Sequence, residues 1–128
     1  FIRAAAVISG LDEDGVEAVE IAVMEAVENV IDHGGNDRAT TIRVEVHPTH
    51  DSLTVEVKDR GRPWPRAVLD GEVGREMPPP EAARGRGMAM MHALMDEVTP
   101  VQYEDGTKPL RMIKKIPPQA RVAGQSGE

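Results

Sequence analysis

The sequence predicts an α+β protein, a two-layer sandwich in which helices cover one face of a mixed, mostly antiparallel sheet. Residues 16–33 have the apolar spacing of one long helix. Residues 41–47 and 53–58 instead alternate apolar and polar side chains, as strands with one covered face do. Strand-like segments occur in pairs rather than in β-α-β units, which favours an antiparallel sheet. The 128 residues fit one domain, expected at 1–116 and followed by a disordered tail at 117–128.

The N-terminal part is predicted to be helical. Phe1–Gly10 has the composition of the end of a helix closed by a glycine, and Asp12 has a side chain that caps helices. Val16–His33 is the strongest helix prediction, and Gly34 and Gly35 would end it. Its apolar stripe and the two residues that flank the stripe are Val16, Val19, Val23, Val27, Val30, Met24 and Ile31.

A hairpin and a long loop are expected next. Thr41–His47 and Leu53–Lys58 would pair as antiparallel strands around a turn at 48–52. Residues 60–84 are rich in proline and charge and show little periodicity. Because this segment is too long for an ordinary connection, we expect a functional loop or lid.

The last elements are a helix and two strands. Residues 85–98 return to helical spacing. Asp105-Gly106 marks a tight turn, with strands expected before it at 101–104 and after it at 110–116. The apolar stripe of the helix is Met88, Met91, Leu94, Met95 and Val98.

Composition restricts the possible functions. Aromatic residues make up only 2% of the chain, so aliphatic residues and Met must fill the core. The formal net charge of −7 argues against direct binding to nucleic acid and suits a basic partner. Without Cys, a bilayer-length apolar run or a signal peptide, the sequence is compatible with a cytoplasmic protein that has no membrane partner. Because it begins at Phe1, we expect a piece of a longer chain.

One side of the predicted 16–33 helix is polar. Glu25, Asn29 and Asp32 lie opposite the valine stripe, and Ala18 and Ala22 continue their side toward the N-terminus. Small residues allow another group to approach closely. A carboxylate and a carboxamide one turn apart offer oxygens to a hard cation such as Mg²⁺, or a base beside a metal. The alternative is an ordinary solvated face.

Two glycine-containing segments suggest a nucleotide. Asp59 ends a strand, where a carboxylate can accept a hydrogen bond from the exocyclic amine of adenine and would repel the carbonyl of guanine. Gly61 lets the backbone pass close to a flat base, although the same pair also suits a simple turn. Gly85 and Gly87 open a helix, where exposed N–H groups and the helix dipole favour a phosphate. The alternative for these two glycines is a flexible hinge with a glycine cap.

Taken in order, these segments resemble the GHKL ATPases of the Bergerat fold, the superfamily of gyrase, MutL and sensor histidine kinases. Within it, the sequence is most similar to bacterial anti-sigma factors with serine-protein kinase activity. The resemblance covers roughly residues 16–116. The motifs that carry it are Glu25-x-x-x-Asn29, Asp59-x-Gly61, Gly85-x-Gly87 and Asp105-Gly106-Thr107.

The resemblance implies a site for ATP and Mg²⁺. Asn29 would hold the metal, and Glu25 would act as the catalytic base or would polarise the attacking hydroxyl. Asp59 would bind adenine, with Thr107 supporting it through water. Residues implied to contact the nucleotide or its metal are Asn29, Asp59, Gly61, Arg84, Gly85, Arg86, Gly87, Met88 and Thr107.

The implied function is a serine-protein kinase and anti-sigma factor in a partner-switching pathway. Its phosphoryl acceptor would be a STAS-domain anti-anti-sigma protein, and its other partner a sigma factor. Pro63 replaces a second glycine of the superfamily, which predicts a stiffer lid. The family's N-terminal strand and part of its first helix are expected to be missing, which affects a possible homodimer. The alternatives are an interaction module without kinase activity, or a domain of a larger histidine kinase or phosphatase-containing regulator.

Overall fold

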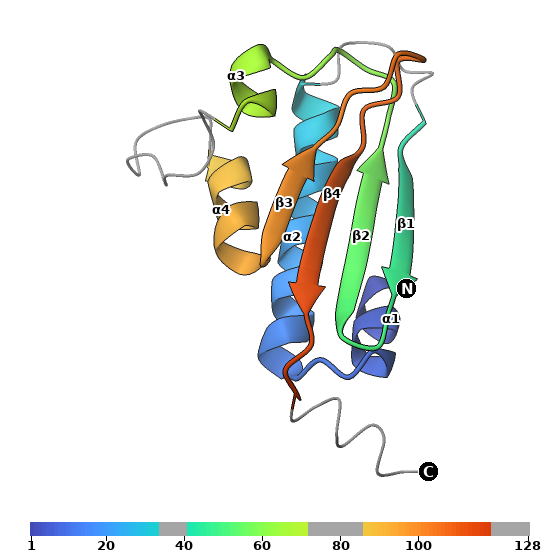
Figure 1. Ribbon diagram of the computed structural model, residues 1–128, viewed down its shortest axis with the longest axis vertical. Helices are drawn as coiled ribbons and strands as arrows, with labels where there is room; N and C mark the ends of the chain where they lie inside the picture. The colour runs from blue at the N-terminus through green and yellow to red at the C-terminus, as the bar shows by residue number, and fades with distance from the viewer. Residues whose placement is uncertain (34–40, 72–85, 119–128) are drawn as a thin grey trace.

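A computed structural model describes residues 1–33, 41–71 and 86–118 of the chain. Within these ranges, three helices lie against one face of a four-stranded sheet, and a fourth, short helix lies beyond one end of it (Figure 1). The predicted α+β class and its two layers are confirmed. The elements are α1 Ile2–Ile8, α2 Glu13–His33, β1 Arg43–Pro48, β2 Ser52–Lys58, α3 Arg66–Leu69, α4 Arg86–Leu94, β3 Glu97–Pro100 and β4 Leu110–Lys115.

The sheet has the strand order β1-β2-β4-β3, and each of these neighbouring pairs is antiparallel. The described sheet is therefore antiparallel throughout, in line with the prediction of a mostly antiparallel sheet. The predicted hairpin is confirmed, with Val44 opposite Val57. Along the central strand β2, alternate residues are buried beneath the helices, beginning with Leu53. The opposite face carries ion pairs, among them Lys58 with Glu45 and Glu56 with Arg111.

Helix α2 lies between α1 and α4 and supplies much of the core (Figure 1). Most of its predicted valine stripe is buried. Ala18 and Ala22 are also buried, at 8% and 0% exposure, so their side of the helix is packed rather than open. The physical reason is that neighbouring helices cover α2 on both sides, and small side chains permit close packing. Met24 and Ile31, by contrast, are exposed.

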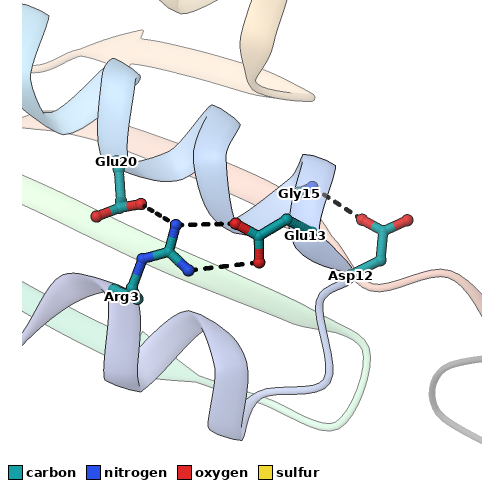
Figure 2. A network of polar contacts seen from close by, with 5 residues as sticks. All are labelled: Arg3, Asp12, Glu13, Gly15 and Glu20. Atoms are coloured by element: carbon teal, nitrogen blue, oxygen red, sulfur yellow. Dashed lines mark hydrogen bonds and ion pairs between the residues drawn. The ribbon is translucent and has the colours of Figure 1, made fainter.

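The turn between α1 and α2 is fixed by polar contacts. Asp12 caps α2 as predicted, because its Oδ1 accepts a hydrogen bond of 2.8 Å from the Gly15 N–H. The helix begins at Glu13, three residues before the predicted start at Val16. Arg3 on α1 forms ion pairs of 2.9 Å with Glu13 and Glu20 on α2 (Figure 2). Hydrogen bonding to Arg3 lowers the pKa of Glu13 below its ordinary value.

The helix predicted at 85–98 is confirmed over Arg86–Leu94 but ends early, and the strand predicted at 101–104 is wrong. Helix α4 ends at Leu94, and Glu97–Pro100 is strand β3. Two hydrogen bonds attach this segment to β4: the Asp96 N–H donates to the Ile113 carbonyl, and Asp96 Oδ2 accepts from the Lys115 N–H. The expected strand at 101–104 is instead part of the turn that leads to β4. Pairing with a distant strand therefore overrides the helical spacing.

The remaining predictions divide between described and undescribed residues. The glycine turn before β4 is confirmed, because Gly106 has a φ of 91°. The expected lid at 60–84 contains helix α3, but 72–85 lie outside the described residues, as do Gly34, Gly35 and residues 119–128 of the expected tail. Among the described helices, none combines the length and the apolarity needed to cross a membrane.

Candidate functional site

The carboxylate of Asp59 is buried directly after β2. The residue is 3% exposed, and its Oδ2 accepts a hydrogen bond of 2.8 Å from the Gly61 N–H. This bond explains the spacing of the two residues, because an aspartate commonly accepts from the backbone two residues later. The other oxygen, Oδ1, is also buried and accepts no hydrogen bond. The bond to Gly61 therefore holds Asp59 in one orientation, with Oδ1 as the oxygen that this bond does not engage.

Lys108 faces this remaining oxygen. Its Nζ lies 3.2 Å from Asp59 Oδ1, and the two side chains are 4% and 0% exposed. The main chains also meet, since the Lys108 N–H donates to the Asp59 carbonyl over 3.0 Å. The pairing of β2 with β4 explains this contact: Val57 lies opposite Leu110, so two residues further on Asp59 lies opposite Lys108. The sequence analysis missed Lys108, because its position depends on a pairing between distant strands.

Trp64 forms the next layer. Its ring centroid lies 4.4 Å from Lys108 Nζ, a distance typical of a cation–π contact. The Trp64 backbone N–H donates to Gln102 Oε1 over 3.1 Å, which ties the start of the expected lid to the turn before β4. The indole Nε1 is buried and has no hydrogen-bond partner. Asp59, Lys108 and Trp64 thus form a stack that runs from the end of β2 outward.

Glu25 and Gly87 bring α2 and α4 together. A Cβ placed on Gly87 would lie only 2.9 Å from Glu25 Oε2. The start of α4 therefore approaches the Glu25 carboxylate so closely that a side chain at position 87 would displace it. Asn29, one helical turn further along α2, is half-buried. The structure thus places Glu25 of the Glu25-x-x-x-Asn29 motif against Gly87, the second glycine of the Gly85-x-Gly87 motif.

The other predicted residues are placed as follows. Arg86 is exposed at the first position of α4, whereas Met88 is partly buried and packs against the hydrophobic core. Thr107 lies in the turn before β4, where its N–H donates to Asp105 Oδ1 over 2.8 Å. This bond lowers the pKa of Asp105. Arg84 and Gly85 lie outside the described residues.

The segments that carry Asp59 and Thr107 lie at the same end of the molecule as the C-terminal end of α2. The end of α2, the end of β2 and the turn before β4 lie at the upper end in Figure 1, and α4 begins on the same side of the sheet as α2. An open hollow of about 810 Å³ lies elsewhere, where α2 begins and β4 ends, lined in part by Asp12 and Lys114. It includes none of the predicted site residues.

A nucleotide with a metal ion fits this chemistry. The Asp59 carboxylate can accept a hydrogen bond from an amine, as it already faces the Lys108 ammonium, and the absence of a side chain at Gly87 lets the Glu25 carboxylate lie against the start of α4. Within the described ranges, no three His, Cys, Asp or Glu residues cluster as a metal site. A magnesium ion would therefore rely on few protein oxygens, those of Asn29 and Glu25, together with nucleotide phosphates, as this ion commonly does.

Comparison with known proteins identifies the family. The profile of the histidine kinase-like ATPase domain matches residues 1–114. The chain belongs to this family, which confirms the resemblance seen in the motifs.

Two relatives are serine-protein kinases named RsbW. The one from Oceanobacillus iheyensis is 30% identical over 70% of this chain, and the one from Listeria innocua is 29% identical over 77%. The matches span 60% and 65% of the lengths of these relatives, less than two thirds of each. Among solved structures, the catalytic domain of the histidine kinase ThkA, in a nucleotide-free form, is similar with a TM-score of 0.62. That match covers 82% of this chain and 69% of the other, at 14% identity, and supports the fold alone.

Proposed function

We propose that this protein is an ATP- and Mg²⁺-dependent serine-protein kinase and anti-sigma factor. Its substrate would be a serine of a STAS-domain anti-anti-sigma protein, and its other partner a sigma factor, which would place its action in the cytoplasm. The observation that carries the proposal is the Asp59 carboxylate, buried directly after β2 with one oxygen held by the Gly61 N–H and the other facing Lys108. Membership of an ATPase family and similarity to serine-protein kinases support it.

Each residue would contribute a separate interaction. Asp59 accepts from the exocyclic amine of adenine, and Gly61 leaves room for the base. Asn29 offers its carboxamide oxygen to the metal, and Glu25 accepts the proton of the serine hydroxyl. The backbone N–H groups of the Gly85-x-Gly87 motif bind phosphate oxygens, with positive charge from Arg84 or Arg86.

The bound nucleotide and its ion supply the phosphoryl group and neutralise its charge. In-line phosphoryl transfer needs positioning and electrostatic stabilisation more than covalent participation by the protein. Glu25 suits the role of base because its carboxylate tip lies against Gly87, at the start of the helix proposed to hold the phosphates. Thr107 is next to Lys108 in the chain. Its predicted support of Asp59 through water would therefore act on a carboxylate that already forms an ion pair with Lys108.

A phosphorylation assay tests the proposal. Purified protein, radiolabelled ATP with Mg²⁺ and a STAS-domain protein should yield a labelled serine on the STAS protein. Glu25→Ala should abolish this labelling while ATP binding persists, and Asp59→Asn should weaken ATP binding itself. Glu28→Ala, an exposed carboxylate on the same helix, is the matched control and should keep full activity. Unchanged labelling by the Glu25→Ala protein would remove Glu25 from the mechanism.

One observation favours a second function, an interaction module without kinase activity. The side chain of Asp59 is 0% exposed and ion-paired with Lys108, so this conformation does not present the carboxylate to a base. In that case the chain would bind its protein partners without phosphorylating them. Calorimetric titration with ATP and Mg²⁺ separates the two, because the module predicts no heat of binding.

A further inference from the structure

We propose that Lys108 sets the nucleotide affinity of this protein, because its ammonium group occupies the place on Asp59 that the exocyclic amine of a base would take. The inference rests on the proposed function, since it concerns the same site. It goes further in naming a residue of this chain that must move before a nucleotide can bind. Three observations on the described residues carry it.

The first observation is how the two oxygens of Asp59 are engaged. Oδ2 accepts from the Gly61 N–H at 2.8 Å, a bond that also shapes the turn after β2. Oδ1 faces Lys108, whose Nζ lies 3.2 Å from it. A base amine that approaches Oδ1 would therefore meet the lysine ammonium already beside this atom.

The second observation is burial. The Asp59 side chain is 0% exposed and that of Lys108 is 4% exposed, so a base cannot reach Oδ1 while Lys108 stays in place. Reaching Oδ1 therefore requires the Lys108 side chain to move away from Asp59.

The third observation is the position of Trp64 on the outer side of Lys108. The ammonium lies 4.4 Å from the ring centroid, so Lys108 lies between an anion and an aromatic face. The backbone N–H of Trp64 is bound to Gln102, which holds this residue in place. Trp64 is the only tryptophan of the chain, so its fluorescence reports on Lys108 directly.

Lys108 therefore has opposite effects on folding and on binding. Its removal leaves the Asp59 carboxylate buried and unpaired, which destabilises the folded protein. The same removal frees Oδ1 for the base amine. Nucleotide binding should then be stronger, because the Lys108 side chain no longer has to be displaced before the base can bind. A lysine with a purely structural role would weaken both properties when replaced.

The test compares ATP–Mg²⁺ binding by isothermal calorimetry in the wild-type protein and in Lys108→Met, Lys108→Arg and Lys115→Met. Lys108→Met should bind ATP at least about tenfold more tightly, and its Trp64 fluorescence without nucleotide should resemble that of ATP-saturated wild-type protein. Lys108→Arg keeps the charge and should bind no more tightly than wild type. Lys115→Met, an exposed lysine at the end of β4, is the matched control and should leave affinity unchanged.

Equal or weaker ATP binding by folded Lys108→Met would overturn the inference and leave the proposed function standing. Absence of ATP binding in all four proteins would overturn both.

A second measurement uses the wild-type chain and does not depend on the folding of a variant. Lys108 should resist an amine-reactive reagent without nucleotide and react faster once ATP is bound, as measured by mass spectrometry. An unchanged Lys108 labelling rate at saturating ATP would contradict the displacement.

Discussion

Replacing Gly87 by alanine should separate stability from catalysis. The added Cβ would lie 2.9 Å from Glu25 Oε2, whereas the next nearest atoms, Cδ and Cβ of Glu25, lie at 3.9 and 4.0 Å. Only the tip of the Glu25 side chain must therefore move, by roughly half an ångström to reach ordinary contact. A rotated side chain costs on the order of 1 kcal/mol. Alanine regains a similar amount, about 1 kcal/mol, relative to glycine within a helix.

The two terms nearly cancel, so the free energy of unfolding of Gly87→Ala should stay within about 1 kcal/mol of the wild-type value. Phosphoryl transfer is more sensitive, because displacing a catalytic group by about 1 Å can cost roughly a hundredfold in rate. We expect a loss of about tenfold or more in the rate of STAS-protein phosphorylation. Urea unfolding followed by circular dichroism and the radiolabelled ATP assay measure the two properties separately.

Gly15→Ala is the matched control. Its Cβ would meet Asp12 Oδ1 at 3.1 Å and Leu11 Cδ2 at 3.2 Å, at the start of α2 and away from Glu25. Because these contacts require shifts of only a few tenths of an ångström and do not involve Glu25, this variant should keep its phosphorylation rate, unlike Gly87→Ala. A Gly87→Ala protein with normal stability and a full phosphorylation rate would refute the reasoning, because the position of the Glu25 carboxylate would then not matter.

Two further predictions concern stability. Asp12→Ala removes the cap of α2 and should lower the free energy of unfolding by about 1 kcal/mol in urea titrations, with Asp14→Asn as the control; an unchanged midpoint would contradict the cap. Hydrogen bonding to Lys58 lowers the pKa of Glu45 below its ordinary value of 4.5. The contribution of this pair to the free energy of unfolding is therefore fully present above pH 4.5 and is lost as the pH falls through the lower pKa of the folded state. Glu45→Gln should therefore be less stable than wild type at pH 7, and the difference should close below pH 4.5, whereas a constant difference across this range would contradict the assignment.

The helices and the hairpin were predictable because their signals are local. The valine stripe of 16–33 repeats over many turns, and the alternation of 53–58 matches a strand with one buried face. The cap at Asp12 was also predictable, since the residue type and its place before an acidic turn are local properties. Each of these features needs only neighbouring residues to specify it.

Strand β3 was not predictable on the same basis. The position of Val98 fits the apolar spacing of the preceding helix as well as it fits a strand. An apolar residue is expected to be buried in both, so its burial does not distinguish them. The choice is made by β4, which pairs with Glu97–Pro100 and accepts the Asp96 N–H at Ile113. Information about a partner strand that lies further along the chain is not contained in the periodicity of residues 85–98.

The candidate site shows the same division between local and non-local information. Its motifs were found because glycine, aspartate and asparagine at fixed spacing carry a chemical meaning, and the structure places two of them, at Gly87 and Glu25, against each other. Lys108 carries no such local signal, since most lysines are solvated. Only the β2–β4 register places it opposite Asp59.

The family and the individual chain therefore contribute different parts of the function. The family assignment rests on residues 1–114 as a whole, whereas the buried ion pair between Asp59 and Lys108 is a property of this chain. Family motifs alone would assign ATP binding of ordinary strength to any chain that contains them. If Lys108 competes for Asp59 as proposed, the strength of binding depends on one residue outside those motifs, and for that reason affinity has to be measured on this protein rather than inferred from its relatives.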